Sequence, residues 1–317
     1  MAAAAAVRLR GILVGVLMGC STSGGTISDM TRLTVAVLGT GIMGAAMARS
    51  LAREGHTVRV WNRSPEKAQA VEQEGITAVG SVREAVRKAD AVLTVLFDAD
   101  SVLAVTDDIV DALRLDAVWL QVSTVGPEGA RRIAKEVPQA HERLLDAPVL
   151  GTRQPAEDGK LVVLLSGPKK ARARAEPVLE AIGSRTVVVG KEVGQASALK
   201  LACNSWVATV NAGTAQALAL AQGMGVDPAL FLEAVKGGPV DAPYVQLKGA
   251  LMIEQDWDTP SFAVDGVRKD IALMVEAAKA ADVPPKLLKA LASYYERASE
   301  DGLGGADMAA VRAAFDR

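Results

Sequence analysis

Two short segments of this 317-residue chain carry side chains at spacings suited to chemistry. In "GQASALKLACN", Lys200 and Asn204 are four residues apart and would share one face of a helix. Lys200 lies in an otherwise apolar run, where desolvation lowers the pKa of an ammonium group toward that of a proton donor working near neutrality. Asn204 would orient the lysine or hold a substrate oxygen. The spacing alone leaves a second interpretation open, in which Lys200 extends from an amphipathic helix into solvent.

The second segment is a glycine-rich turn, "GTGIMG", between an apolar strand and a helix. Gly39 would permit a tight turn, Gly41 the approach of a pyrophosphate to the backbone, and Gly44 close packing of the helix on the strand. The motif alone is weak evidence, but a strand precedes it, a helix follows it, and a second strand, "TVRVW", comes next. The turn therefore predicts a dinucleotide site, whose other residues are Thr40, Ile42 and Met43.

The end of the second strand predicts which dinucleotide binds. An Asp or Glu usually holds the ribose 2′-hydroxyl of NAD at this point, whereas this chain has Asn62, Arg63 and Ser64. An arginine with neighbouring polar donors can bind a 2′-phosphate, which a carboxylate would repel. We therefore expect NADPH or NADP⁺ rather than NADH, and no metal. The alternative is that Arg63 is an ordinary solvated loop residue.

Composition excludes some partners and the usual proton donor. The formal net charge is -2, and Lys and Arg are spread without a basic block, which argues against nucleic acid and for a small-molecule partner. The chain has two histidines, His56 in a turn and His141 in a polar segment, and both are expected to be structural. The proton donor must therefore come from another residue type.

The elements that position these residues change character along the chain. Before Gly190, apolar runs alternate with helical patterns, which is typical of a doubly wound, mostly parallel α/β sheet buried on both faces. The runs cover residues 33–39, 57–61, 91–97, 117–123, 143–150, 160–167 and 185–190, with helices at 42–54, 127–136 and 169–182. The last two runs flank the third of these helices and are expected to bring an antiparallel strand to one edge.

After Gly190 the strand signal stops. Residues 193–224 contain no proline and predict one long helix of about 48 Å, enough to cross a domain or subunit boundary. Further helices are predicted at 228–235, 267–281, 285–300 and 306–315. The fold prediction is therefore an α/β Rossmann domain over residues 30–192, followed by an all-helical substrate and dimerisation domain over residues 193–317.

Residues 1–29 need a separate interpretation. Two arginines, a short apolar run and "LMGC" resemble a secretory or lipoprotein signal, and the run is too short to span a bilayer. The alternative is that translation starts at Met30 and that 1–29 is a mis-annotated extension. A genuine signal would imply export and a membrane anchor; otherwise a cytoplasmic location is expected, which suits a Cys203 without a disulfide partner.

Five segments in order resemble the β-hydroxyacid dehydrogenase family. They are "VLGTGIMG", "STV" at 123–125, "DAPVLGTRQPAEDGKL" at 146–161, "GQASALKLACN" at 194–204 and "FAVDGVRKD" at 262–270. The family includes 3-hydroxyisobutyrate dehydrogenases, tartronate semialdehyde reductases and glyoxylate/succinic semialdehyde reductases. The resemblance covers residues 33–317 and implies an NADP-dependent dehydrogenase or reductase, in which Lys200 protonates the carbonyl oxygen as hydride arrives and Asn204 supports the substrate.

The resemblance also implies the rest of the site. The substrate would meet Ser123 and Thr124, the loop Leu150 to Thr152 that includes Gly151, and the closing residues Phe262 and Asp270. The cofactor would meet Lys269 and, on weaker grounds, Ser101 at the nicotinamide ribose. A homodimer is implied as well, with the site between the sheet domain and the helices.

Departures from the family fall where the substrate is chosen. A serine-containing triplet such as "SGG" usually follows "DAPV", but this chain has Leu150, so its pocket should be less polar than a hydroxyacid site. The usual "G-x-G" before the lysine is replaced by Gly194, Gln195 and Ala196. Because "PAEDG" resembles the glyoxylate/succinic semialdehyde branch, we expect reduction of a semialdehyde or related small carbonyl.

Two alternatives remain at this stage. An imine reductase-like NADPH enzyme is favoured by Leu150 and by the "WNRS" turn, but is opposed by Lys200, since that group usually has an aspartate or tyrosine there. A non-catalytic NADP-binding scaffold is opposed by the retention of Lys200, Asn204, Ser123 and Lys269.

Overall fold

One mixed sheet organises the first half of the chain. The structure, a computed structural model, describes residues 32–316, so the interpretations of residues 1–29 and of a start at Met30 lie outside the described residues. Within the described part, nine strands form one sheet in the order β3-β2-β1-β4-β5-β6-β8-β7, with β9 paired to β8. The strands are β1 (Thr34–Leu38), β2 (Thr57–Trp61), β3 (Ile76–Ala78), β4 (Ala91–Thr94), β5 (Val118–Gln121), β6 (Leu144–Asp146), β7 (Val149–Leu150), β8 (Leu161–Ser166) and β9 (Gly183–Gly190).

Strands β1 to β6 all run parallel, and the strand order reverses between β1 and β4. Ligands of such sheets bind beyond the carboxyl ends of the strands at this reversal. The glycine turn follows β1 there, and the loops after β4 and β5 end beside it. The topology therefore places the predicted dinucleotide turn at the position where a Rossmann sheet binds its cofactor, and the predicted fold class is confirmed.

Both faces of the sheet are buried, as the continuous apolar runs predict. In β1, Val35 and Val37 belong to one core, and Ala36 and Leu38 to the other. The first core is closed by α1 (Ile42–Arg53) and α8 (Lys169–Ile182), and the second by α3 (Val82–Val86), α5 (Thr106–Ala112) and α6 (Gly126–Glu136). The connections also contain α2 (Pro65–Gln69), α4 (Ala99–Leu103), η1 (Pro138–Arg143) and α7 (Arg153–Glu157).

The far edge of the sheet reverses direction. Strand β8 pairs antiparallel with β6 and β7, while β9 pairs parallel with β8. The expected antiparallel strand is therefore present, and the predicted run 143–150 divides around Pro148 into β6 and β7 because proline cannot donate to the ladder. The sequence pattern missed β3, a strand of three residues of which Ile76 is buried.

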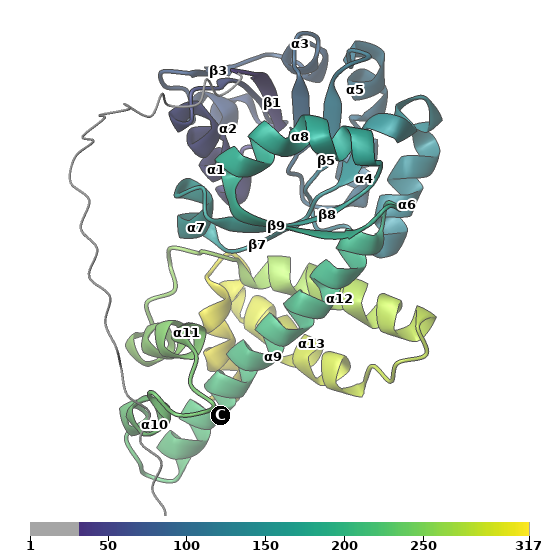
Figure 1. Cartoon of the computed structure of the whole chain (residues 1–317). Coiled ribbons are helices and arrows are strands. Elements are labelled where there is room, and N and C mark those ends of the chain that lie inside the picture. Colours follow the sequence, from purple (N-terminus) through teal and green to yellow (C-terminus); the bar gives the residue numbers. More distant parts are fainter. Residues whose placement is uncertain (1–31, 317) are drawn as a thin grey trace, which may run out of the picture. The chain divides into compact units, whose positions relative to one another are not determined.

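The second half is helical, and Figure 1 shows its long helix α9 (Gln195–Gly223) running from the sheet among the other helices. These are α10 (Ala229–Val235), α11 (Pro243–Glu254), α12 (Val264–Ala280), α13 (Lys286–Ala298), a π-helical turn η2 (Ser299–Leu303) and η3 (Met308–Phe315). The helix predicted at 306–315 is a 3₁₀ helix that begins after Asp307. Among residues 32–316, no helix combines the length and the apolar character needed to cross a membrane.

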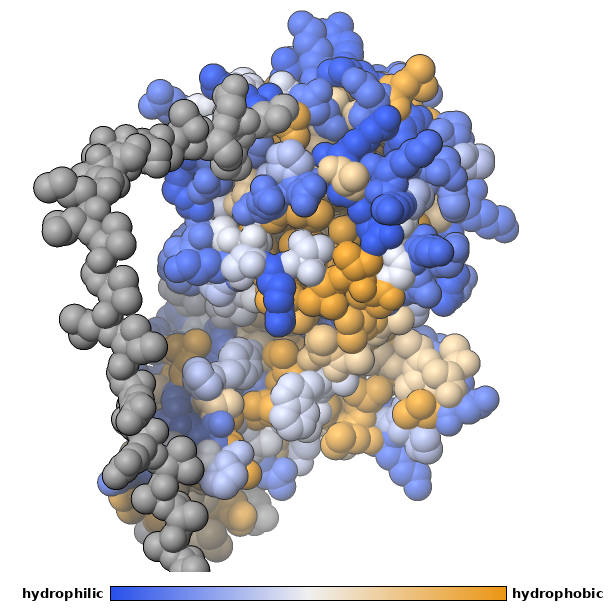
Figure 2. Space-filling view, viewed as in Figure 1, coloured by the Kyte–Doolittle hydropathy of each residue, from blue (hydrophilic) through white to orange (hydrophobic). Residues whose placement is uncertain are grey.

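Helix α11 was not predicted. Its sequence, PYVQLKGALMIE, is apolar on most sides, so it shows no clear amphipathic period. Lys248 stands where a charged residue normally indicates an exposed face, yet its side chain is 1% exposed. Figure 2 shows apolar side chains gathered over β9 and over parts of the helical half, whereas the outer helices of the sheet are mostly hydrophilic.

Candidate functional site

A large cavity lies beyond the carboxyl ends of β1, β4 and β5. Its volume is about 1910 Å³, and α9, α11 and α12 form its other walls. The structure brings all of the predicted cofactor and substrate residues to this cavity except Thr40, which lies behind it and is 7% exposed. The cavity therefore extends from the glycine turn to the helix that carries Lys200.

The three glycines of the turn differ in their surroundings. Gly39 has a φ of +105°, and a Cβ there would lie 2.2 Å from the Val95 carbonyl oxygen. A Cβ on Gly44 would lie 1.9 Å from the Gly39 carbonyl oxygen. A Cβ on Gly41, at the start of α1, would meet no atom within 4 Å and would face open space. Gly39 and Gly44 thus make the turn compact, and Gly41 leaves backbone N–H groups open to a pyrophosphate.

Asn62 braces the turn. Its Oδ1 accepts from the Thr40 N–H at 3.2 Å, and its Nδ2 donates to the Ser64 carbonyl oxygen at 3.1 Å. The Thr40 hydroxyl is buried and has no hydrogen-bond partner within the described residues. A buried hydroxyl without a partner is costly, so this atom is well suited to a ligand that reaches the turn.

Two cations at the glycine-turn end of the cavity make no ion pair within the described residues. Arg63 is exposed, and its guanidinium makes no hydrogen bond or ion pair within residues 32–316. The same is true of the Lys67 ammonium group, one helical turn later in α2. Sequence reasoning missed Lys67, although its position four residues after Arg63 could have indicated it. Together with Ser64 they make a positive corner suited to a phosphate.

The carboxylates that line the cavity are paired. Four ion pairs account for every lining carboxylate and, apart from Arg63 and Lys67, for all but one of the lining cations among the described residues. The pairs are Glu157–Arg153 at 3.1 Å, Asp265–Arg268 at 2.8 Å, Asp270–Lys269 at 2.9 Å and Asp307–Lys248 at 2.6 Å. Lys200 is the cation without a carboxylate partner, so its charge is the one available to a substrate.

Lys200 is held by the backbone of β7. Its Nζ donates to the Val149 carbonyl oxygen at 2.7 Å, and its side chain is half-buried against the cavity wall. Burial lowers the pKa of Lys200 from 10.5 to about 8, and the charges of Asp270 and Cys203 oppose this shift. The ammonium group is therefore protonated near neutrality and still loses its proton readily, as a general acid requires.

Asn204 and Asp270 hold each other. Asn204, 6% exposed, donates from Nδ2 to Asp270 Oδ2 at 2.6 Å. The Lys269 ammonium group lies 2.9 Å from the other Asp270 oxygen and donates to the Thr124 carbonyl oxygen at 2.5 Å. These contacts join α9, α12 and the loop after β5, so they fix that loop relative to the helices.

The Ser123 hydroxyl is already engaged in this structure. It donates to the Thr94 carbonyl oxygen at 3.1 Å and accepts from the Leu96 N–H at 2.8 Å, and the residue is 4% exposed. The Gln121 side chain also accepts from the Ser123 N–H at 3.0 Å. Thr124 is more accessible, and its hydroxyl makes no hydrogen bond within the described chain. The loop is thus rigid, and Thr124 offers its unused hydroxyl to the cavity.

The start of α9 is anchored to the sheet by Asp146. This buried carboxylate, at the end of β6, accepts from the Gly194 N–H at 2.9 Å, the Ser197 N–H at 2.8 Å and the Ser197 hydroxyl at 2.7 Å. Burial raises the pKa of Asp146, and these hydrogen bonds oppose the rise. Sequence reasoning placed Asp146 in a motif but gave it no role. These contacts fix the first turn of α9 on the sheet, and they thereby fix the position of Lys200 on that helix.

The remaining predicted residues lie as follows. The Ser101 N–H donates to Asp98 Oδ1 at 2.8 Å, and the residue lines the cavity. His56 is buried away from the cavity, its Nδ1 accepts from the Leu33 N–H at 3.2 Å, and burial lowers its pKa. His141 is exposed. Among the described residues, no group of three or more His, Cys, Asp or Glu side chains could hold a metal ion.

Two family models match the chain. Residues 34–190 match the model described as the NAD binding domain of 6-phosphogluconate dehydrogenase. Residues 194–315 match the model described as the NAD-binding domain of NADP-dependent 3-hydroxyisobutyrate dehydrogenase. The boundary between the two models falls at the start of α9, where the strands end and the helices begin.

Individual proteins are similar over most of their length. Glyoxylate/succinic semialdehyde reductase 2, chloroplastic, of Arabidopsis thaliana is 31% identical over 92% of this chain and 82% of its own. The uncharacterized oxidoreductase YfjR of Bacillus subtilis is 30% identical over 88% of this chain and 98% of its own. The crystal structure of 3-hydroxyisobutyrate dehydrogenase (ygbJ) from Salmonella typhimurium superimposes with a TM-score of 0.81 at 27% identity, covering 89% of this chain and 99% of that one.

Proposed function

The chain belongs to the β-hydroxyacid dehydrogenase family of NAD(P)-binding oxidoreductases, and we propose that it is an NADPH-dependent reductase of a small carbonyl compound with Lys200 as its acid/base. The observation that carries the proposal is the position of Lys200. It is a half-buried lysine with a pKa of about 8 and no carboxylate partner within the described residues, on the wall of the cavity that contains the dinucleotide turn. This arrangement suits a proton donor to a developing alkoxide.

The phosphorylated cofactor is supported by the charges at its end of the cavity. Arg63 and Lys67 are without charged partners in the described chain and lie beside Ser64, where the 2′-phosphate would bind. Residues 62–65, directly after β2, include no carboxylate that could receive a free ribose hydroxyl. The residues that would hold the rest of the cofactor are the glycine turn, with the Thr40 hydroxyl behind it, and Lys269.

The chain's own residues would divide the reaction between binding and proton transfer. The reduced nicotinamide supplies the hydride when bound. Lys200 gives its proton to the carbonyl oxygen, and the Val149 carbonyl keeps the ammonium group in place while it does so. In the reverse direction the neutral amine would accept the alcohol proton. Asn204, fixed by Asp270 through one Nδ2 hydrogen, can donate its second Nδ2 hydrogen to a substrate oxygen, and the Thr124 hydroxyl offers a second contact.

The substrate side of the cavity supports a small carbonyl with an apolar portion. Leu150, Val207, Leu251 and Phe262 are partly exposed there, and Leu150 replaces the family's usual serine. Lys200 is the cation left unpaired at this end, so a single anionic group could still be accepted. A semialdehyde or a related small carbonyl meets both conditions.

The test is the oxidation of NADPH and NADH, followed with a panel of semialdehydes, 2-oxo acids and cyclic imines for the natural chain and for Lys200→Met. The proposal expects NADPH-dependent reduction of a carbonyl that Lys200→Met reduces about 10²- to 10⁴-fold. Turnover of imines that does not need Lys200 would instead favour an imine reductase. Background rates across the panel would indicate a cofactor-binding scaffold.

We also propose a homodimer that works in the cytoplasm. Large apolar side chains are exposed along α9 to α11, including Trp206 (68%), Leu220 (59%) and Leu247 (58%), and a second copy could cover them. Sedimentation of the purified chain tests this part. The presence of NADPH inside the cell supports the cytoplasmic location, and fractionation of the source cells tests it.

A further inference from the structure

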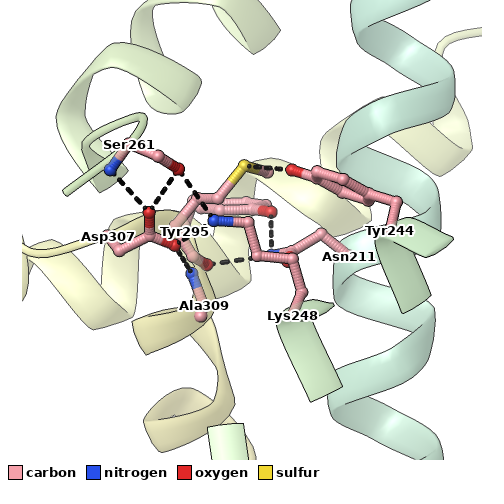
Figure 3. Close-up of polar contacts among 8 residues, drawn as sticks. Asn211, Tyr244, Lys248, Ser261, Tyr295, Asp307 and Ala309 are labelled. Atoms are coloured by element: carbon pink, nitrogen blue, oxygen red, sulfur yellow. Dashed lines mark hydrogen bonds and ion pairs between the residues drawn. The ribbon is translucent and has the colours of Figure 1, made fainter. Parts of the chain in front are cut away.

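A buried ion pair lies at the helical end of the cavity (Figure 3). Lys248 of α11 and Asp307, which directly precedes η3, have side chains 1% exposed, and Nζ lies 2.6 Å from Oδ1. Both residues also line the cavity wall. A buried pair costs much of its attraction in desolvation, so it is weak evidence for stability. The Lys248–Asp307 pair is instead suited to holding the surrounding chain in one conformation.

Asp307 fixes residues 257–263, which form most of the connection between α11 and α12. Its Oδ2 accepts from the Ser261 N–H at 2.9 Å and from the Ser261 hydroxyl at 2.8 Å. Its own N–H donates to the Trp257 carbonyl oxygen at 2.8 Å, and the next N–H, of Met308, donates to the Phe262 carbonyl oxygen at 2.8 Å. This segment is therefore held at its first residue and near its end by Asp307 and its neighbour.

Lys248 completes the arrangement. Besides the ion pair, its Nζ donates to the Ser261 hydroxyl at 3.0 Å, so Lys248, Ser261 and Asp307 form a closed set of contacts (Figure 3). Burial raises the pKa of Asp307, but Lys248 and the N–H donors outweigh burial and hold this pKa below its usual value. Asp307 therefore accepts these hydrogen bonds as a carboxylate throughout the neutral range.

The Phe262 ring rests on the helix that follows. A Cβ added to Gly266, in the first turn of α12, would lie 2.7 Å from a ring carbon of Phe262. The ring thus lies directly over backbone, with no room for a side chain beneath it. Phe262 lines the cavity, and two independent features determine where its ring lies.

We propose that Lys248 and Asp307 are positioning residues, which hold segment 257–263 so that Phe262 forms a fixed wall of the substrate cavity and sets the KM for the carbonyl substrate. The inference rests on the proposed function for the identity of that substrate. It concerns neither hydride nor proton transfer, because the pair lies on the helical wall and contacts neither Lys200 nor the glycine turn.

The test compares Lys248→Met, Ser261→Ala and Gly266→Ala with Ser293→Ala. The control serine lies on α13, away from the cavity, and donates only to the Ala290 carbonyl within its helix. Lys248→Met and Ser261→Ala are expected to raise the KM for the carbonyl about tenfold, with the KM for NADPH unchanged within about twofold. Gly266→Ala should raise the same KM by displacing the ring while it leaves the ion pair intact.

Amide hydrogen exchange separates this inference from the proposed function, because it needs no substrate. The backbone amides of residue 261 and of Met308 should exchange faster in Lys248→Met and Ser261→Ala, but not in Gly266→Ala or Ser293→Ala. Unchanged exchange in Lys248→Met and Ser261→Ala would overturn the inference, and so would equal increases in the KM of carbonyl and NADPH. If no carbonyl is reduced by the natural chain, the proposed function fails while the exchange result still decides the positioning role.

Discussion

Lys200 makes the pH dependence of the reaction predictable. With a pKa lowered from 10.5 to about 8, the neutral fraction of Lys200 at pH 7 rises from about one in 3,000 to about one in ten. Reduction needs the protonated form, so kcat for carbonyl reduction should be level below pH 7 and fall about fivefold between pH 8 and pH 9. Alcohol oxidation needs the neutral amine and should rise over the same range.

A substitution of Asp270 tests whether Lys200 is the group that titrates. Its charge raises the pKa of Lys200 against burial, so Asp270→Asn should move the alkaline limb of kcat to lower pH. Glu276→Gln is the matched control, because Glu276 lies on the same helix and pairs with Lys279 at the surface. The assay is a pH–rate profile of NADPH oxidation for the natural chain, both variants and Lys200→Met.

Three outcomes would refute the assignment of Lys200. A limb near pH 8 that survives in Lys200→Met would show that another group donates the proton. An alkaline limb that Asp270→Asn leaves in place would show that the titrating group does not sense the charge of Asp270. An equal shift in Glu276→Gln would attribute the effect to net charge rather than to position.

Three further predictions concern other residues. Arg63→Ala should raise the KM for NADPH about 10- to 100-fold, equivalent to about 1.5–3 kcal/mol for a charge-assisted hydrogen bond, and should leave the KM for NADH unchanged, as steady-state kinetics would measure. His56→Gln should flatten the pH dependence of stability: a histidine with a lowered folded-state pKa contributes stability above its unfolded pKa of about 6.5 that is lost as pH falls below it. Urea unfolding at pH 7.5 and pH 5 tests this. Leu150→Ser should raise kcat/KM for carboxylate-bearing carbonyls relative to apolar ones, and competition between two such substrates measures the ratio.

The parts of the fold that the sequence predicted are those whose signals are local. The strands before Gly190 are continuous apolar runs, and a strand buried on both faces leaves that pattern in its own residues. The long proline-free segment likewise predicted α9 to within a few residues at each end. The glycine turn combined a short motif with its flanking strand and helix, so the dinucleotide site was predicted from the pattern, whereas its place at the reversal of strand order came from the structure.

The parts that were missed depend on contacts between distant residues. Lys248 breaks the apolar pattern of α11, and its partner Asp307 lies 59 residues later, so neither residue alone indicates a buried pair. Asp146 reaches the start of α9 across 48 residues, and the sheet brings them together. Ser123 lines the cavity as predicted, but the contact of its hydroxyl with β4 depends on the pairing of β4 with β5 and has no local signal.

Strand β7 contains both Leu150, where this chain departs from the family, and Val149, whose carbonyl oxygen holds Lys200. A change at Leu150 is therefore expected to affect the pKa of Lys200. Asp146 anchors α9 and Val149 holds the lysine, so residues on either side of Pro148 fix both the helix and its ammonium group. Leu150 follows Val149 directly and lines the same cavity as Lys200. Since burial is the main cause of the lowered pKa, an aliphatic residue here keeps water from the lysine as well as making the pocket less polar. A serine at this position should therefore change substrate preference and also raise the pKa of Lys200, which moves the alkaline limb of reduction upward.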